Sequence, residues 1–211
     1  MIRFSLFGIP VRVHPFFWLT LAVIGGALSA DSPEAIFRIL LFLLAGFISI
    51  LVHELGHALT ARKFGARSEI VLQAFGGYAA YSGVRMTRPQ SFMITAAGPA
   101  VQIGLGIALL MVIPSLPELN QNALYFLVVL NWISLVWALL NLLPVLPLDG
   151  GQMLNAVLGP DRIKTTLWIS LVVAATAGLL LYLLFKSLLA PIFMGMFAWQ
   201  SWQALRENRW R

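Results

Sequence analysis

Cysteine is absent from the 211 residues of this chain, and charged residues make up only 10% of it. Without thiols the chain has no disulfide, no thiolate metal site and no cysteine nucleophile, so any transition metal must be bound by histidine and carboxylate side chains. Soluble domains carry charge on about a quarter of their residues. Together with 60% hydrophobic residues and a mean hydropathy of +0.87, this shortage of charge predicts a polytopic membrane protein.

The basic excess does not indicate a nucleic-acid-binding protein. The formal net charge is +6, but the Lys and Arg residues are spread along the chain, with lipid-like segments between them. A nucleic-acid surface needs its basic residues gathered into one patch or stripe. We therefore expect no nucleic-acid partner, and a lipid bilayer as the surroundings of the chain.

Apolar stretches predict an all-α polytopic fold with about six transmembrane helices, in a single domain of residues 1–211. The second stretch, residues 34–64, would be about 45 Å long as a helix and would cross a hydrocarbon layer of about 30 Å. We interpret the first stretch as a retained membrane helix. The expected spans are residues 14–30, 34–64, 89–113, 123–143, 165–185 and 188–204.

A small β-hairpin or β-sheet is expected directly after the second helix. In residues 67–83 the helical periodicity gives way to short runs, in which Ile70 and Leu72 alternate with their neighbours. Gly76 and Gly77 would form the turn of this strand pair.

The distribution of Lys and Arg predicts the orientation, because cytoplasmic loops hold the excess of basic residues. With the N-terminus inside, twelve of the 14 basic residues lie inside and only Arg38 and Lys186 lie outside. Both termini of this multi-pass cell-membrane protein would then be cytoplasmic, with the basic aromatic tail, residues 206–211, at the membrane interface. The end of the second span and the segment around Asp149 would lie on the same cytoplasmic side.

The motif His53-Glu54-Leu55-Gly56-His57 stands at the end of the second span. Histidines four residues apart lie about 40° apart around a helix, so both imidazoles can bind one ion. Glu54 points about 100° away from His53, which suits a base beside the metal better than a third ligand. A chance occurrence would bury these groups near lipid at a cost of several kcal/mol. The motif therefore predicts a zinc peptidase site inside the membrane.

A zinc peptidase site needs three protein ligands and a fourth position for water. Among the eight carboxylates, Asp149 alone lies in an apolar segment on the same side as the motif. Two prolines and two glycines interrupt the helix there, and such backbone persists at membrane depth only against protein or a watery cavity. Asp149 is the predicted third ligand. His14 is the alternative, although it could equally anchor the start of the first span.

Three further sites are candidates for substrate binding. Asn141 could bond the substrate backbone or the developing oxyanion, or could cap the interrupted helix. Gly76 and Gly77 are either a simple turn or adjoin a strand edge that pairs with an unwound substrate. His14 is a candidate helper near the site.

These residues resemble the site-2 protease family of intramembrane zinc metalloproteases. The compact form, without an inserted PDZ domain or an appended nucleotide-binding regulatory domain, most resembles the branch of the sporulation sigma-factor processing proteases. The resemblance implies that His53, His57 and Asp149 bind Zn²⁺ and that Glu54 is the catalytic acid/base. Gln102 departs from the pattern, since many members have Asn there. The matching segments are residues 12–15, 53–57, 75–77, 97–99, 141–144 and 147–151.

We therefore expect a zinc-dependent endopeptidase that cleaves a membrane-protein substrate in or near a transmembrane segment, as in regulated intramembrane proteolysis. A metal transporter could use the same ligands, but should carry polar residues along several spans, and spans one, five and six have almost none. A metal-binding scaffold without activity would have no need of Glu54, which is present.

Overall fold

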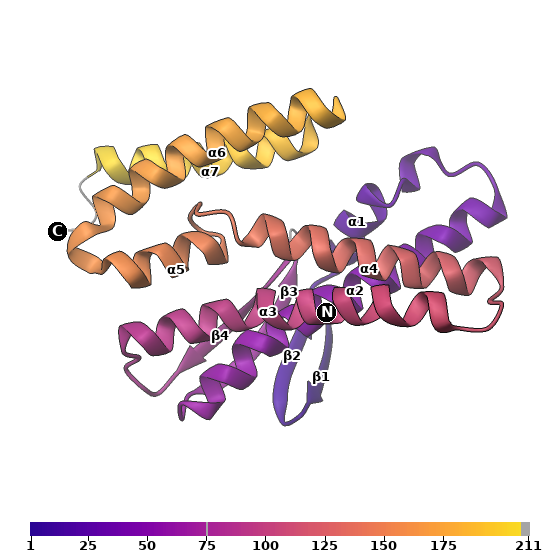
Figure 1. The fold of residues 1–211 in the computed structure, drawn as a ribbon, viewed down its shortest axis with the longest axis horizontal. Coiled ribbons are helices and arrows are strands. Elements are labelled where there is room, and N and C mark those ends of the chain that lie inside the picture. The colour runs from indigo at the N-terminus through magenta and orange to yellow at the C-terminus, as the bar shows by residue number, and fades with distance from the viewer. Residues whose placement is uncertain (75, 208–211) are drawn as a thin grey trace. The chain divides into compact units, whose positions relative to one another are not determined.

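The computed structural model describes residues 1–74 and 76–207, and most of these are helical (Figure 1). The chain divides into two compact units, Met1–Arg85 with Ala97–Ala138 and Met86–Ala96 with Leu139–Arg211. Phe75 and the basic aromatic residues 208–211, which entered the sequence predictions, lie outside the described residues. The helices are α1 (Pro15–Ile24), α2 (Pro33–Lys63), α3 (Arg88–Val112), α4 (Gln121–Asn141), α5 (Asp149–Leu158), α6 (Ile163–Phe185) and α7 (Leu189–Arg206).

Among the described residues, four helical stretches are long and apolar enough to cross a membrane, and they match four of the predicted spans. The first predicted span, residues 14–30, is not one helix: α1 has ten residues and gives way to a 3-10 turn at Ala27–Ser29. Gly26, with φ at +91°, separates the two. The number of six spans stays a prediction. The four stretches are Pro33–Lys63, Arg88–Ser115, Gln121–Asn141 and Pro160–Leu184.

Helix α2 is the longest element, and its ends follow from local chemistry. The hydroxyl of Ser32 accepts a hydrogen bond of 3.2 Å from the Ala35 amide, Pro33 occupies the first turn, and Glu34 adds the negative charge favoured there. Arg62 and Lys63 place positive charge in the last turn, which favours the helix end. With 31 residues the helix is about 46 Å long, so it can cross the bilayer and continue beyond it.

The part of the chain that the structure describes has one four-stranded sheet, which belongs to the first unit and has the strand order β1-β2-β3-β4. Strands β3 (Arg67–Gln73) and β4 (Gly76–Ser82) are antiparallel, which confirms the hairpin predicted after the second helix. The N-terminal hairpin of β1 (Ile2–Leu6) and β2 (Ile9–Val13) was missed.

The sequence did carry a signal for the N-terminal hairpin. Its turn lies at Phe7 and Gly8, both with positive φ, as a two-residue hairpin of this type requires. Ile9, Val11 and Val13 alternate with more exposed residues and are buried. Strand β2 then pairs in parallel with β3, a pairing between distant segments that hydrophobic alternation alone does not reveal.

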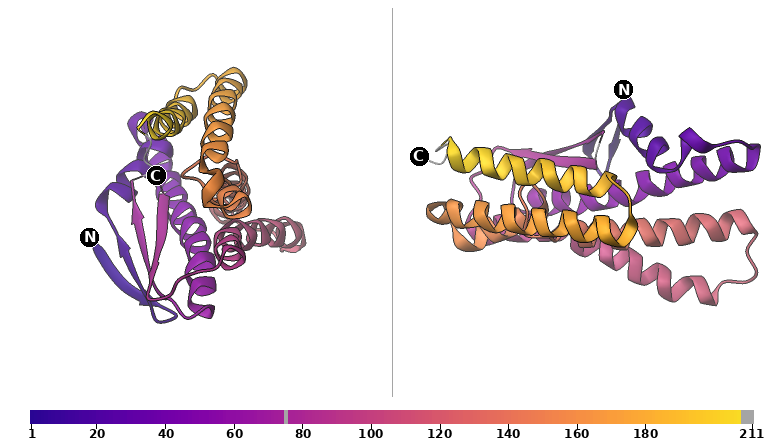
Figure 2. Two further views of the ribbon diagram at one scale, coloured as in Figure 1. Left: turned by 90° about the vertical axis from the view of Figure 1, so that its left-hand side faces the viewer. Right: turned by 90° about the horizontal axis from the view of Figure 1, so that it is seen from above.

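One face of the sheet packs on α2, as the left view of Figure 2 shows. The apolar side chains in this layer are nearly inaccessible, so the sheet and the helix form one core. The core therefore holds β3 and β4 beside the helix that carries the histidine motif. Its members include Ile9, Val11 and Val13 of β2, Ile70 and Leu72 of β3, and Ile50, Leu51, Leu55 and Ala58 of α2. In the second unit, α6 and α7 lie side by side (Figure 2).

Glycine permits a close approach between α2 and α3. A Cβ atom at Gly56 would lie 2.6 Å from the carbonyl oxygen of Ala97 and 2.9 Å from the Cα of Gly98. Both are backbone atoms of α3, which cannot turn aside as a flexible side chain can. A Cβ at Gly104, by contrast, would meet nothing within 4 Å. Small residues at such contacts are typical of helix pairs in lipid.

We expect Gly56→Ala to lower the free energy of unfolding by about 1–3 kcal/mol, because the added methyl group overpacks the α2–α3 contact. Gly104→Ala is the matched control and should be neutral or stabilising by up to about 1 kcal/mol, since alanine is the better helix former. Denaturant unfolding of both variants in the same detergent measures the difference. An equal effect of the two substitutions would contradict the close contact.

Candidate metal and catalytic site

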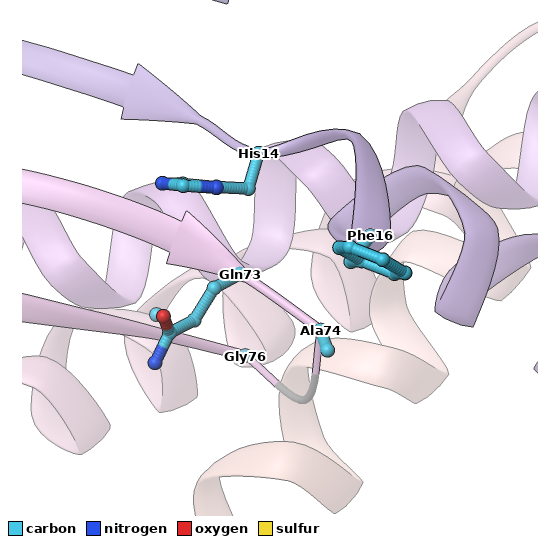
Figure 3. A pocket seen from close by; sticks show the side chains of 6 residues that line it. His14, Phe16, Gln73, Ala74 and Gly76 are labelled. Atoms are coloured by element: carbon cyan, nitrogen blue, oxygen red, sulfur yellow. The ribbon is translucent and has the colours of Figure 1, made fainter. Parts of the chain in front are cut away.

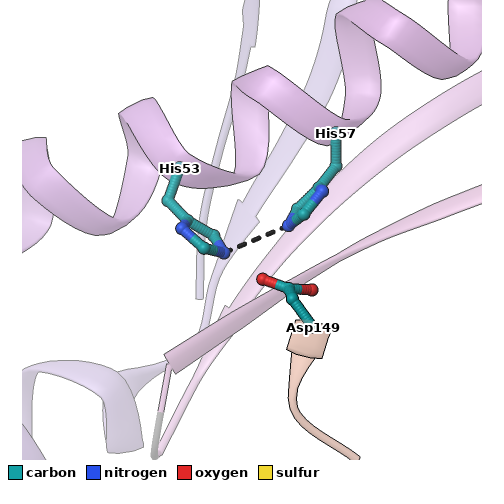
Figure 4. A group of neighbouring side chains, drawn as sticks. All are labelled: His53, His57 and Asp149. Atoms are coloured by element: carbon teal, nitrogen blue, oxygen red, sulfur yellow. Dashed lines mark hydrogen bonds between the residues drawn. The ribbon is translucent and has the colours of Figure 1, made fainter. Parts of the chain in front are cut away.

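Helix α2 presents His53 and His57 on one face, one turn apart (Figure 4). Their Nε2 atoms are 3.1 Å apart. Two nitrogens bound to one tetrahedral zinc ion at about 2.0–2.1 Å would be about 3.3 Å apart. Both side chains are buried, with exposed fractions of 3% and 8%. The spacing of the pair therefore fits two ligands of one metal ion.

The other ring nitrogen of His53 also has a partner. Its Nδ1 atom lies 2.9 Å from Oε1 of Gln102, a fully buried residue of α3. Histidine ligands of metals almost always make such a bond through the nitrogen that faces away from the metal, and the bond fixes the orientation of the ring. Sequence reasoning noted Gln102 only as a departure from a family pattern. The signal that could have found it is its polarity within an otherwise apolar span.

Gly98 of α3 lies directly against His57. A Cβ atom built at Gly98 would overlap the Nε2 and Cε1 atoms of the His57 ring. The absence of a side chain at this position therefore makes the space that the imidazole occupies. Sequence reasoning included residues 97–99 only as a segment of the family resemblance, and the structure adds the contact between Gly98 and His57.

The Glu54 side chain lies against strand β4. A Cβ atom at Gly77 would be 2.7 Å from Cγ and 2.8 Å from Oε1 of Glu54, so only glycine fits between the strand and the carboxylate. Glu54 itself is buried. Sequence reasoning treated Gly77 as part of a turn or of a substrate-binding edge. The structure places it as the second residue of β4, an edge strand of the sheet, where it packs on the glutamate of the motif.

A cavity of about 270 Å³ opens beside the start of β4 (Figure 3). His14 lines it, together with Gln73 at the end of β3 and with Gly76 and Gly77. His14 is the residue before α1, and its backbone amide donates a hydrogen bond of 2.9 Å to the carbonyl of Leu72. The structure therefore brings His14, Gly76 and Gly77 together around one cavity, and Gly77 also contacts Glu54.

Asp149 is the first residue of α5, and the segment before it confirms the predicted interruption of the helix. Side chains bond some of the backbone groups of this segment: Ser170 of α6 accepts a bond of 3.0 Å from the Leu146 amide, and Gln152 donates one of 2.9 Å to the Pro147 carbonyl. Asp149 is buried, with 7% of its surface exposed. Asn141 is the last residue of α4 and is partly buried.

The glycines after Asp149 allow the turn into α5 to be tight. A Cβ atom at Gly150 would overlap the Leu142 carbonyl oxygen, and one at Gly151 would be 2.5 Å from the Leu146 amide nitrogen. Both obstacles are backbone atoms, so no side chain could be accommodated. The tight turn into α5 therefore requires glycine at both positions after Asp149.

His53 and His57 belong to the first unit and Asp149 to the second, and all three side chains, which Figure 4 draws, are buried. Imidazole and carboxylate are ligands that suit zinc. With Glu54 next to His53 in the sequence, the chain offers metal ligands and an ionisable group of the kind that moves protons.

The chain is similar to several metalloproteases. The model of peptidase family M50 matches residues 41–118 and 116–185. A zinc metalloprotease of Methanocaldococcus jannaschii is 36% identical over 156 residues, which cover 74% of this chain and 44% of that protein. Stage IV sporulation protein FB of Bacillus subtilis is 32% identical over 147 residues, covering 68% and 46%. This chain spans less than half the length of these two relatives.

Among solved structures, a site-2 protease from Methanocaldococcus jannaschii matches with a TM-score of 0.69 and 28% identity. The match covers 97% of this chain and 94% of that one. The likeness therefore extends over nearly the whole fold, including the segments that carry His53 and Asp149.

We expect Gly98→Ala to weaken Zn²⁺ binding by about tenfold or more, because the added methyl group must displace the His57 ring, and displaced support of a ligand typically costs 10- to 100-fold in affinity. Competition with a chelator, in detergent, measures the affinity. Gly104→Ala on the same helix is the control and should bind zinc as the wild type does. Unchanged affinity of Gly98→Ala would show that His57 is not a ligand in the observed position.

Proposed function

Because this chain belongs to peptidase family M50, we propose that it is a zinc-dependent endopeptidase that cleaves a membrane-protein substrate in or near a transmembrane segment. The observation that carries the proposal is the pair of buried imidazoles, with Nε2 atoms 3.1 Å apart, on a helix apolar enough to cross a membrane. The glutamate between them in sequence, Glu54, is buried as well.

In this proposal His53, His57 and Asp149 bind one Zn²⁺ ion. Support comes from the donor set, since three ligands of this kind leave a fourth position for water or substrate, as in catalytic zinc sites. A zinc ion held there would polarise the scissile carbonyl and lower the pKa of its water to about 7. Gln102 and Gly98 support the positions of the two imidazoles.

Glu54 is proposed as the general acid/base. Its carboxylate would take a proton from the attacking water and deliver it to the nitrogen of the leaving amine. This role needs a carboxylate that keeps its position through both transfers. The helix backbone and the contact with Gly77 of β4 restrict the Glu54 side chain in this way.

The substrate would bind as an extended segment. A peptide bond inside a helix has its amide and carbonyl groups engaged in the helix, so the substrate must unwind before cleavage. Strand β4 is at the edge of the sheet, and such an edge can pair with an extended peptide. The cavity lined by His14, Gly76 and Gly77 is the proposed place for a substrate side chain. Asn141 is proposed to hydrogen-bond the substrate backbone or the developing oxyanion.

We further propose six spans within one protease domain of residues 1–211, with both termini in the cytoplasm. The basic residues support this orientation, and His57 lies five residues, or about 8 Å along the helix, from Arg62 at the cytoplasmic boundary. The site would then lie inside the membrane but close to cytoplasmic water, which hydrolysis requires.

Replacing Glu54 should separate catalysis from metal binding. We expect Glu54→Gln to cut a co-expressed membrane substrate at least about 100-fold more slowly, because the amide cannot accept the proton, while it still binds zinc. Asp149→Ala should lose both substrate cleavage and zinc binding. The substrate can be captured with Glu54→Gln, which should hold it uncut. Cleavage is followed by gel shift, and zinc by elemental analysis.

Matched controls are available for both substitutions. Glu118→Gln and Asp161→Ala change exposed carboxylates outside the site and should leave cleavage and zinc content unchanged. Full cleavage by Glu54→Gln or by Asp149→Ala would refute the mechanism. Zinc flux into proteoliposomes by a wild type that cuts no substrate would instead indicate a transporter.

The proposed topology predicts which positions react with a membrane-impermeant maleimide in intact cells. The natural chain lacks cysteine, so each single substitution provides the only thiol. Ser115→Cys and Ser187→Cys should be labelled from outside, whereas Ser82→Cys should be labelled only after the cells are opened. All three serines are exposed. Labelling of Ser187→Cys only in opened cells would exclude the last two of the six spans.

A further inference from the structure

A chain of buried hydrogen bonds runs from His53 away from the proposed metal. Oε1 of Gln102 lies 2.9 Å from His53 Nδ1, and Nε2 of Gln102 lies 2.8 Å from Ser49 Oγ and 3.3 Å from the Ser49 carbonyl oxygen. Ser49 Oγ is 3.0 Å from Ser134 Oγ, which is 2.7 Å from the Leu130 carbonyl oxygen. The side chains of Gln102, Ser49 and Ser134 are completely buried.

Two backbone carbonyl oxygens, those of Leu130 and Ser49, determine which group donates the hydrogen in each bond of this chain. A carbonyl oxygen only accepts, so Ser134 must donate its single hydroxyl hydrogen to Leu130. The bond between the serines is then donated by Ser49, which leaves Ser49 Oγ as an acceptor for Gln102. The Ser49 carbonyl independently requires the NH₂ group of Gln102 on this side.

The assignment continues to His53. Because the NH₂ group of Gln102 faces Ser49, its carbonyl oxygen Oε1 faces His53 and can only accept. The hydrogen of this bond must therefore be on Nδ1 of His53. In the neutral imidazole the other nitrogen, Nε2, then has no hydrogen and keeps its lone pair, which is the form that binds a metal.

We propose that Gln102 is a positioning residue, which holds His53 in the tautomer with hydrogen on Nδ1 and directs its Nε2 lone pair toward the zinc ion. The inference rests on the proposed zinc site. It adds a reason why a histidine buried among apolar helices keeps the tautomer that binds a metal. Helices α2, α3 and α4 each supply one member of the chain, Ser49, Gln102 and Ser134, so the packing of three helices sets the ring orientation.

The polar residues themselves argue for a specific use. A glutamine is seldom buried completely, and three buried polar side chains in apolar helices cost free energy unless every group is paired. Here each donor of the chain has an acceptor, and the chain ends on a ring whose orientation matters for metal binding. A purely structural contact between the helices would not need to end on His53.

Nuclear magnetic resonance of the metal-free protein in detergent, with ¹⁵N-labelled histidine, tests the tautomer directly. The chain has three histidines, so the signals can be assigned with single substitutions. At about pH 8, where imidazoles are neutral, we expect His53 to carry its hydrogen on Nδ1 in the wild type. Gln102→Leu, of similar size but without an acceptor, should lose this preference. A wild-type His53 with its hydrogen on Nε2 would overturn the proposal.

Zinc affinity separates positioning from a general loss of stability. We expect Gln102→Leu to bind zinc about 10- to 100-fold more weakly, as is typical when the partner of a metal-binding histidine is removed. Asn131→Leu is the matched control: it removes the hydrogen bond of 2.6 Å from the Asn131 side chain to the Gly106 carbonyl, which also joins α4 to α3 but does not belong to the chain that ends on His53, so zinc affinity should change less than about threefold. Thermal unfolding of both variants reports the structural cost.

The outcomes also distinguish this inference from the proposed function. If Gln102→Leu kept wild-type zinc affinity while Glu54→Gln lost cleavage, Gln102 would not position the ligand and the peptidase proposal would stand. If the wild-type protein bound no zinc, the metal site would be wrong and the positioning role with it. Equal losses of affinity in Gln102→Leu and Asn131→Leu would indicate a structural effect and overturn the proposal.

Discussion

The requirement that every buried polar group has a partner governs this structure, because most of its helices are too apolar to be surrounded by water. Inside lipid an unpaired polar group costs several kcal/mol. Helix α2 nevertheless buries two imidazoles and a carboxylate within five residues. The surrounding elements are arranged around these groups: α3 supplies an acceptor for His53, and β4 passes directly against Glu54.

Close approach is the second feature of the site, and it depends on glycine. Gly56 and Gly98 bring α2 and α3 near enough for the His57 ring to lie on backbone, and Gly77 does the same for β4 and Glu54. A side chain that lies between its own helix and the backbone of a neighbouring element has little freedom to rotate, so its functional atom keeps one position. Rigid support of this kind is what a metal ligand or a general base requires.

In the segment before α5, where the helix is interrupted, buried backbone polar groups also need partners. Ending a helix leaves amides and carbonyls without helical partners, and the side chains of Ser170 and Gln152 bond three of them. The two glycines after Asp149 then permit a turn that no other residue would fit. A buried carboxylate can thus begin a helix next to an interruption whose backbone groups would otherwise be costly to bury.

The sequence by itself determined the features that depend on neighbours along the chain. The apolar lengths of α2, α3, α4 and α6, the hairpin of β3 and β4, and the interruption before Asp149 all follow from local periodicity and from proline and glycine. The placing of His53 and His57 on one face is of the same kind, since residues four apart on any helix share a face.

Only the tertiary structure decided which distant residues meet. It paired β2 with β3, placed Gln102 behind His53, Gly98 against His57 and Gly77 against Glu54, and joined Ser49 to Ser134. Periodicity states which face of an element is apolar, but not which partner covers it. From the sequence, a glutamine within an apolar helix is therefore only an unexplained polar residue. The fold shows which hydrogen bond it makes.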